Sequence, residues 1–237
     1  GGQIYFGTVL EHILIQNLCA FYDVGEHNEM KLHGADWNDA LDMAWDKGES
    51  VAFTCAYAGN LLDIAKCLRN VEKISGINRI EVLDELKLLL ADDEILYNCP
   101  DKKQELLMSY AKACENCTSG GTALIPIAAI CENLEHKAEW MMKNIRERCE
   151  SGDVRMMLTG QVFAIMSGTA KKEQIKAICN SADKYLFDQK AGGYRLNTDF
   201  KEEKFDLGRM FGFAYGEKEN GAVFSHMAVM YANALYE

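Results

Sequence analysis

The sequence contains little proline and no long apolar run that lacks charged residues. Only two of its 237 residues are proline, Pro100 and Pro126. Because proline breaks the interior of a helix, its scarcity leaves nearly the whole chain free to form long helices. A membrane-spanning helix needs roughly 20 predominantly apolar residues, whereas the apolar stretches here are periodic and interrupted by charge. We therefore expect a mainly helical protein that does not span a membrane.

The sequence also lacks an excess of positive charge. Its formal net charge is -11 at pH 7, and its lysines are scattered along the chain. Proteins that bind the phosphate backbone of nucleic acids need clustered cations that displace counterions. We therefore expect no nucleic-acid partner. The charge balance favours a ligand that is neutral or small, with any anion held by a few local donors.

A disulfide framework is not evident either. The nine cysteines are odd in number and irregularly spaced, and no signal-like segment precedes them, which is typical of reduced thiols in the cytoplasm. Cys114 and Cys117 have the spacing of a redox or zinc pair, but no second pair and no nearby histidine accompanies them. We expect a functional role for this pair to be the minor alternative.

Apolar residues recur with the helical period over most of the chain. Leu61, Ile64, Ala65 and Leu68 share one face of an expected helix, since they are three and four residues apart. Ser75-Gly76 then supplies a stop signal. Further helices are expected at 79–90, 101–117, 122–149, 154–166 and 172–187, followed by an apolar segment at 222–236. No linker is visible, so we expect a single helical domain over residues 1–237.

The connections between the expected helices carry most of the polar and aromatic side chains. The segment 192–200, for example, reads GGYRLNTDF. Successive helices with such loops predict an all-α fold, namely a partial (α/α)6 toroid of antiparallel helix pairs with its functional loops at one end.

One short segment combines carboxylates, an amide and an indole beside a glycine. It reads HGADWNDALD and contains Asp36, Trp37, Asn38, Asp39 and Asp42. If a helix starts near Asp36, residues 36 and 39 share a face, so that one carboxylate caps the helix and the other projects into a cleft. In the alternative reading Asp36 and Asn38 are caps, Trp37 belongs to the core and Asp42 is solvated.

A second cluster precedes the last apolar segment. It reads GEKENGAVFSH and contains Glu219, Asn220 and His226. A histidine near a helix start has unpaired backbone amides around it, and these favour a bound oxyanion. In the alternative reading His226 simply bonds a neighbouring carbonyl group.

Three segments of the chain together resemble glycoside hydrolase family 94, which contains the cellobiose and related β-glucan phosphorylases. GADWNDALD resembles the acid loop of that family, GGYRLNTDF its following sugar-site segment, and LGRMFGFAYGEKENGAVFSHM its phosphate-side segment, in the same order. The details around Asp39 and His226 are most similar to the 1,2-β-oligoglucan phosphorylase branch. The resemblance covers only the later part of the family's catalytic (α/α)6 barrel.

The resemblance implies a role for each matched residue. Asp39 is implied as the general acid, with Asp36 and Trp37 in the sugar-binding loop. His226 is implied as a phosphate ligand, and Glu219 lies close to the sugar. Arg195 and Asn220 are further implied substrate-binding residues.

A phosphorylase needs only one catalytic carboxylic acid. The glycosidic oxygen leaves readily once an acid protonates it. An inverting hydrolase also needs a second carboxylate to activate water, whereas phosphate is already an anionic nucleophile. The implied reaction is attack of inorganic phosphate on the anomeric carbon of a β-glucoside with inversion, which gives α-glucose 1-phosphate. It requires no metal and no cofactor, with phosphate as co-substrate.

The sequence departs from the family in length. Members are several times longer, and their phosphate site draws on arginines upstream of the acid loop and on a threonine-bearing loop after the histidine. An incomplete helical ring leaves apolar faces to be covered. We therefore expect a fragment that folds as a partial toroid, associates with itself as a homo-oligomer, or associates with a complementary chain that completes the barrel.

Two other functions remain open from the sequence. One is an inverting hydrolase or a sugar epimerase on the same barrel, and in the hydrolytic case Asp36 or Glu219 would serve as the base. A catalytically silent carbohydrate-binding or assembly module would bind sugar without turnover.

Overall fold

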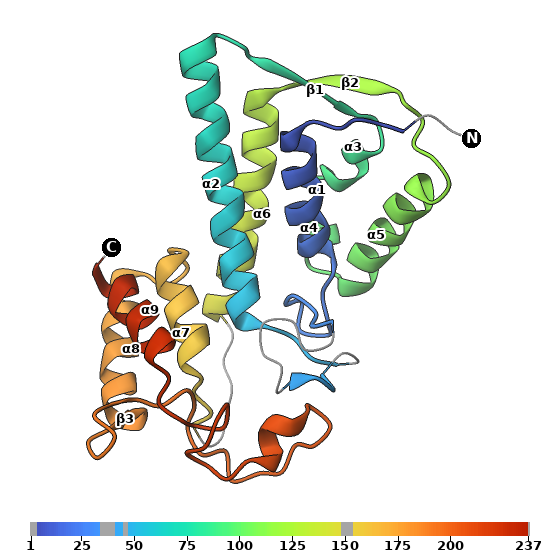
Figure 1. Cartoon of the computed structure of the whole chain (residues 1–237). Coiled ribbons are helices and arrows are strands. Elements are labelled where there is room, and N and C mark those ends of the chain that lie inside the picture. The colour runs from blue at the N-terminus through green and yellow to red at the C-terminus, as the bar shows by residue number, and fades with distance from the viewer. Residues whose placement is uncertain (1–3, 34–40, 45–46, 148–153, 237) are drawn as a thin grey trace. The chain divides into compact units, whose positions relative to one another are not determined.

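The computed structural model describes residues 4–33, 41–44, 47–147 and 154–236, which are mostly helical (Figure 1). This confirms the predicted mainly α character. The chain divides into two compact units. The first comprises residues 1–30 and 57–142, and the second comprises residues 31–56 and 143–237. The interpretation of residues 1–237 as one helical domain stays a prediction.

Three long helices supply most of the core of the first unit. They are α1 (Val9–Tyr22), α2 (Val51–Ser75) and α6 (Ile127–Glu147), which run side by side in Figure 1. Their apolar faces share one buried cluster that includes Leu14, Leu18, Leu61, Ala65, Ile130 and Leu134. The face predicted from Leu61, Ala65 and Leu68 is therefore confirmed, with Ile64 packed against its edge.

A hairpin and three further helices complete the first unit. They are β1 (Arg79–Leu83), α3 (Leu86–Leu89), α4 (Glu94–Tyr97), α5 (Pro100–Cys114) and β2 (Thr122–Pro126). The strands β1 and β2 are antiparallel, with Arg79 opposite Pro126 and Leu83 opposite Thr122. The helix predicted over 79–90 is therefore wrong for its first half, and the helix predicted over 122–149 begins at Ile127. Short apolar runs rich in β-branched residues satisfy either period, so pairing across the hairpin decides the outcome.

The second unit is built on the helices α7 (Leu158–Met166), α8 (Lys172–Tyr185) and α9 (Ser225–Tyr236). Their core includes Leu158, Val162, Ala182, Leu186, Met227 and Tyr231, with Ile175 and Ile178 packed against it. Two short strands, β3 (Phe187–Asp188) and β4 (Gly193–Tyr194), and a 3-10 helix, η2 (Arg209–Gly212), lie between α8 and α9. The polar connections that carry the predicted site residues thus belong to this unit.

One helix of the described chain, α2, has the length and apolar composition of a membrane-spanning segment. Core helices of soluble proteins can meet the same criterion. Ala58, Leu61 and Ala65 of α2 are fully buried against α1 and α6, so α2 has a packing role within the first unit. The expectation that the chain does not span a membrane stays a prediction.

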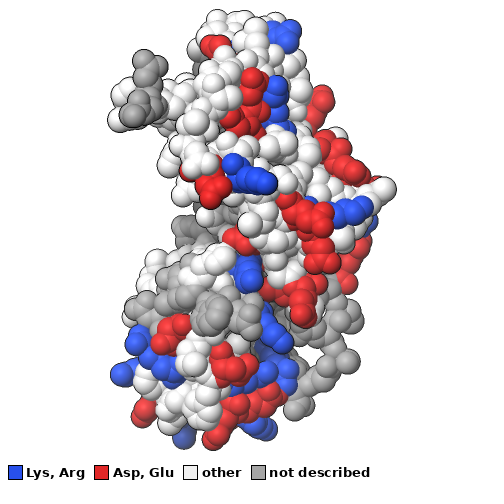
Figure 2. Space-filling view, turned by 90° about the vertical axis from the view of Figure 1, so that its right-hand side faces the viewer, with Lys and Arg blue, Asp and Glu red and all other residues white. Residues whose placement is uncertain are grey.

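Charged side chains of both signs are mixed on the surface. On the face that Figure 2 shows, Lys and Arg lie among Asp and Glu. Ion pairs join Arg69 to Glu135 at 2.6 Å and Lys87 to Asp84 at 2.7 Å. Exposed pairs of this kind contribute little to stability.

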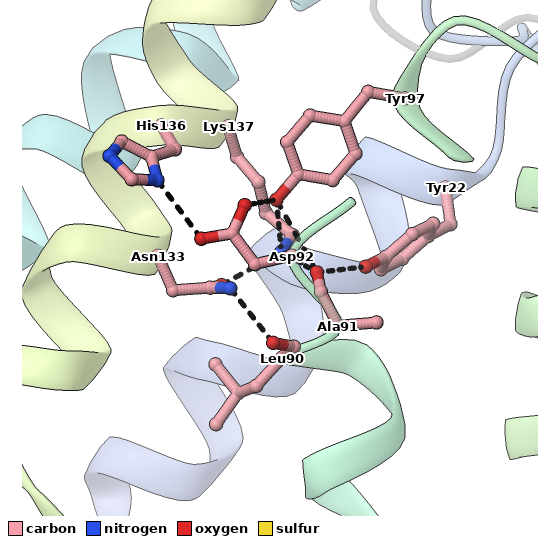
Figure 3. Close-up of polar contacts among 8 residues, drawn as sticks. All are labelled: Tyr22, Leu90, Ala91, Asp92, Tyr97, Asn133, His136 and Lys137. Carbon is pink, nitrogen blue, oxygen red and sulfur yellow. Dashed lines mark hydrogen bonds and ion pairs between the residues drawn. The ribbon is translucent and has the colours of Figure 1, made fainter. Parts of the chain in front are cut away.

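A polar cluster lies inside the first unit (Figure 3). The Nζ of Lys137 donates to the carbonyl of Ala91 at 2.7 Å, to the hydroxyl of Tyr97 at 3.0 Å and to Oδ1 of Asn133 at 2.8 Å. Tyr97 in turn donates to Asp92 at 2.8 Å, and the other carboxylate oxygen of Asp92 lies 2.9 Å from Nδ1 of His136. The three oxygen partners satisfy the donors of the Lys137 ammonium group. Burial nevertheless lowers the pKa of Lys137 to about 7.

The second buried lysine of this unit, Lys103, has a different environment. Its side chain is 0% exposed, and its Nζ has no hydrogen-bond partner. The Nζ lies 4.0 Å from the ring centroids of both Phe21 and Trp140. Burial lowers the pKa of Lys103 to about 6, and the nearby positive charge of Lys137 adds to this shift. The aromatic faces offset only part of the cost of burying a cation, so Lys103 is neutral at pH 8.

The neutral state of Lys103 makes the stability of the first unit depend on pH. Its ordinary pKa is 10.5, so between about pH 6 and pH 10 the unfolded chain binds a proton that the folded chain does not. We expect the free energy of unfolding to rise with pH in this window, with a slope of up to about 1.4 kcal/mol per pH unit from this residue.

Lys103→Met should remove this contribution and raise the melting temperature most at the acidic end of the window. The matched control is Lys102→Met, which changes an exposed neighbour on the same helix. Urea unfolding and thermal unfolding, each followed by circular dichroism from pH 6 to pH 9, measure the free energy of unfolding and the melting temperature. Equal slopes for the Lys103→Met variant and the unmodified chain would contradict the assignment.

Candidate active site

The predicted acid loop lies partly outside the described residues. Asp36, Trp37 and Asp39 all fall within residues 34–40, outside the described ranges. The base of the loop is described, because Lys31 and Glu49 form an antiparallel bridge and the amide of Leu32 donates to the carbonyl of Gly48 at 2.9 Å. The roles predicted for Asp36, Trp37 and Asp39 stay predictions.

The end of the acid loop and the residue after it are tied to the first residue of η2 and to the segment before it. The amide of Arg209 donates to Oδ1 of Asp42 at 3.2 Å, and the amide of Met43 donates to the carbonyl of Leu207 at 3.3 Å. Two of the three motifs that carry the family resemblance therefore meet within the second unit. Asp42 is exposed, as in the alternative reading of the sequence, and it accepts the hydrogen bond from the amide of Arg209.

The segment 195–198 is held by main-chain hydrogen bonds on both sides. The amide of Leu158 donates to Leu196 at 2.8 Å, and the amide of Leu196 donates to Ala222 at 2.9 Å. Thr198 donates to Met156 at 2.9 Å. This segment therefore connects the start of α7 with the residues just before α9, and its side chains have fixed positions.

Arg195 links the β3–β4 hairpin to the following loop. Its Nε donates to Oδ2 of Asp188 at 3.0 Å, and its Nη2 pairs with the same oxygen. Its Nη1 donates to the carbonyl of Gly221 at 2.7 Å, and its guanidinium lies 5.2 Å from the ring centroid of Tyr215. Hydrogen bonds from the amide of Ala191 and from Arg195 keep the pKa of the Asp188 carboxyl below its ordinary value. The substrate contact predicted for Arg195 is not tested by these bonds, which show that it also organises the protein.

Asn197 is the most deeply buried polar residue of this segment, at 0% exposure. Its Oδ1 accepts from the amide of Gly221 at 2.8 Å. Its Nδ2 donates to Oδ1 of Asn220 at 3.2 Å and to the carbonyl of Thr198 at 3.0 Å. Its own carbonyl accepts from the hydroxyl of Tyr215 at 3.1 Å. Sequence reasoning missed this residue, because nothing in a polar loop distinguishes a buried amide from an exposed one.

The loop 215–221 carries two of the predicted site residues. The amide of Gly216 donates to the carbonyl of Asn220 at 2.7 Å, and the amide of Asn220 donates to Glu217 at 3.0 Å. Gly221 has φ 79, and a Cβ there would lie 2.4 Å from Cε2 of Tyr215. Only glycine fits both the left-handed backbone and this close approach.

Glu219 and Asn220 differ in how they use their polar atoms. The Nδ2 of Asn220 donates to the carbonyl of Phe213 at 2.8 Å, while its Oδ1 accepts from Asn197. The amide of Asn220 therefore makes its contacts inside the protein. The Oε2 of Glu219 is buried without a hydrogen-bond partner. An unpaired buried carboxylate oxygen is costly, so this atom is a candidate acceptor for a hydrogen bond from a ligand.

His226 is the second residue of α9 and is exposed. Its ring lies beside that of Phe224, with centroids 5.5 Å apart. The first amides of a helix lack partners within it and favour negative charge. The first turn of α9 is therefore suited to an anion, with His226 as an additional donor.

Among the described residues, no group of three or more His, Cys, Asp and Glu side chains is arranged to hold a metal ion. The polar groups described above for the candidate site are amides, a guanidinium, a carboxylate and an imidazole. Such groups suit a hydroxyl-rich ligand and an anion.

Comparison with known proteins agrees with this chemistry. Residues 140–235 match the catalytic domain of the glycosyl hydrolase 94 superfamily. The chain is 25% identical to solabiose phosphorylase of Paenibacillus borealis over 93% of the chain and 24% of that protein. It is 22% identical to N,N'-diacetylchitobiose phosphorylase of Vibrio proteolyticus over 95% of the chain and 24% of that protein.

A third relative matches over a shorter stretch. Cellobionic acid phosphorylase of Neurospora crassa is 31% identical over 37% of the chain and 11% of its own length. The chain thus spans about a quarter of the length of the two relatives that it matches along most of its sequence. Residues 140–235 are thus similar to part of the catalytic domain of the glycosyl hydrolase 94 superfamily, and the relatives that the chain resembles are named phosphorylases.

Proposed function

We propose that the chain is a segment of an inverting β-glucoside phosphorylase. In this reaction inorganic phosphate attacks the anomeric carbon of a β-linked glucan or disaccharide and gives α-glucose 1-phosphate. The observation that carries the proposal is the match of residues 140–235 to the catalytic domain, which includes both the Glu219 loop and the start of α9. The three relatives described above are all named phosphorylases.

In the proposed reaction Asp39 is the general acid. It protonates the glycosidic oxygen as the bond to the anomeric carbon breaks, and the proton leaves with the shortened acceptor. Asp36 and Trp37 belong to the sugar-binding loop, where an indole offers a flat apolar face to a pyranose ring. No second carboxylate is needed, since phosphate is itself the nucleophile.

The phosphate is assigned to the first turn of α9. His226 is exposed there, and the unpaired amides of a helix start favour an oxyanion. The sugar is assigned to the loop 215–221, where Oε2 of Glu219 lacks a partner and accepts a hydrogen bond from a sugar hydroxyl. Arg195 and Asn220 stay in the proposal as residues of the same loop system.

The proposal also includes the way in which the barrel around the active site is completed. The chain forms part of an (α/α)6 toroid in the cytoplasm, and a second copy or a complementary chain completes the barrel. Support comes from exposed apolar side chains of the first unit, including Ile4, Phe6, Val9 and Ile74.

The unpaired Oε2 of Glu219 also fits one alternative. A module that binds carbohydrate without turning it over needs the sugar loop but not a complete phosphate site. Incubation with β-linked glucose disaccharides, with and without phosphate, separates the functions. Glucose 1-phosphate that forms only with phosphate supports the phosphorylase, free glucose without phosphate supports a hydrolase, and sugar binding without product supports the module.

Substitution of the proposed acid provides a sharper test. Asp39→Asn should lower the rate of phosphorolysis by about 100-fold or more, since it removes general-acid catalysis. The assay measures glucose 1-phosphate in the preparation that turns over, either the chain alone or the completed barrel. Asp63→Asn, an exposed change on α2, is the control. An undiminished rate in the Asp39→Asn variant would exclude Asp39 as the acid.

The phosphate site is tested through His226. His226→Ala should weaken binding of inorganic phosphate by about 10-fold or more, because a hydrogen bond to a charged group is worth about 1.5–3 kcal/mol. Calorimetric titration of the chain with phosphate measures this, and His12→Ala, an exposed histidine of α1, is the matched control. Equal phosphate affinity in both variants would remove His226 from the site.

A further inference from the structure

The backbone of the loop 215–221 has an unfavourable conformation that requires stabilising contacts. Gly216 and Gly221 have φ 97 and φ 79, and Lys218, which is not a glycine, has φ 47. Left-handed backbone at a residue with a side chain costs free energy. Stacking of the Lys218 Nζ 4.8 Å from the ring centroid of Phe213 offsets part of this cost. Main-chain hydrogen bonds within the loop offset a further part, and side chains outside the loop add to them.

Asn197 takes part in three hydrogen bonds that stabilise the loop. Through Oδ1 it fixes the amide of Gly221, and through Nδ2 it fixes the side chain of Asn220, while its carbonyl accepts from Tyr215. These three contacts reach the first residue of the loop and its last two. Because Asn197 is fully buried and its segment is bonded on both sides, it provides a rigid anchor.

Arg195 adds a second attachment two residues away. Its guanidinium holds the carbonyl of Gly221 at 2.7 Å and is itself fixed by Asp188. Both polar ends of the Gly221 residue, its amide and its carbonyl, are therefore bonded to the segment 195–197. Glu219, which lies between the attached residues, makes no such bond through Oε2.

We propose that Asn197 is a positioning residue for substrate binding, which holds the loop 215–221 so that the Glu219 carboxylate is preorganised for a sugar hydroxyl. The inference rests on the proposed function, since it assigns the loop to the sugar. Asn197 itself contacts no substrate. Its effect on affinity arises because a preformed loop need not be ordered when the ligand binds.

The test uses the whole chain and the variant Asn197→Asp. The substitution keeps the shape and the acceptor for Gly221, but it places an oxygen where the amide donates to Asn220 and Thr198. Hydrogen exchange measured by mass spectrometry should be about 10-fold faster over the loop, and affinity for β-1,2-linked diglucose should be about 10-fold weaker, in line with the loss of a buried hydrogen bond. Exchange in α7 and α9 should not change.

Two further variants keep the result interpretable. Tyr215→Phe removes only the hydroxyl that donates to Asn197 and should give a smaller change of the same kind, about 3-fold, even if Asn197→Asp fails to fold. Asn180→Asp introduces the same charge at an exposed position of α8 and should change neither measurement.

Each contrary outcome has a distinct meaning. Unchanged exchange over the loop in both variants would show that Asn197 does not hold it. Faster exchange with unchanged sugar affinity would leave Asn197 with a structural role alone, which overturns the inference. If the unmodified chain binds no diglucose, the proposed function fails and the inference with it, while the exchange data still report whether Asn197 holds the loop.

Discussion

The conformation of the second unit depends on the hydrogen bonds that its buried polar groups require. Asn197 is fully buried, and its amide satisfies that need by bonding Gly221, Asn220 and Thr198. A buried amide without partners would cost more than its bonds contribute, so the residues around it are fixed as a set. The loop between η2 and α9 takes its shape from this requirement and from the Arg195–Asp188 pair.

The first unit contains one buried lysine that meets this requirement and one that does not. Lys137 is buried with three oxygen partners, whereas Lys103 is buried among aromatic rings with none. The polar cluster around Lys137 connects α6 with the segment between α3 and α4. Lys103 makes no such connection, and the rings of Phe21 and Trp140, whose centroids lie 4.0 Å from its Nζ, offset only part of the cost of its burial.

Sequence periodicity predicted the long helices well, because their buried faces extend over many turns. Leu61, Ala65 and Leu68 show this for α2. The same reasoning failed at Arg79–Leu83, where five residues are too few to separate the two periods and the partner strand lies some forty positions away. For the site, motif resemblance singled out Glu219 and His226, whose roles stay predictions, whereas no pattern marks Asn197, which is distinguished by burial and long-range hydrogen bonds. Asp36, Trp37 and Asp39 stay predictions from resemblance.

The unpartnered oxygen of Glu219 has a thermodynamic consequence. The folded chain without ligand carries the cost of a dehydrated acceptor, and that cost disappears when a hydroxyl group fills the position. Occupancy of the loop and resistance to unfolding are therefore linked. Compounds that donate to this atom should reveal themselves by protecting the chain against heat, before any chemical conversion is detected.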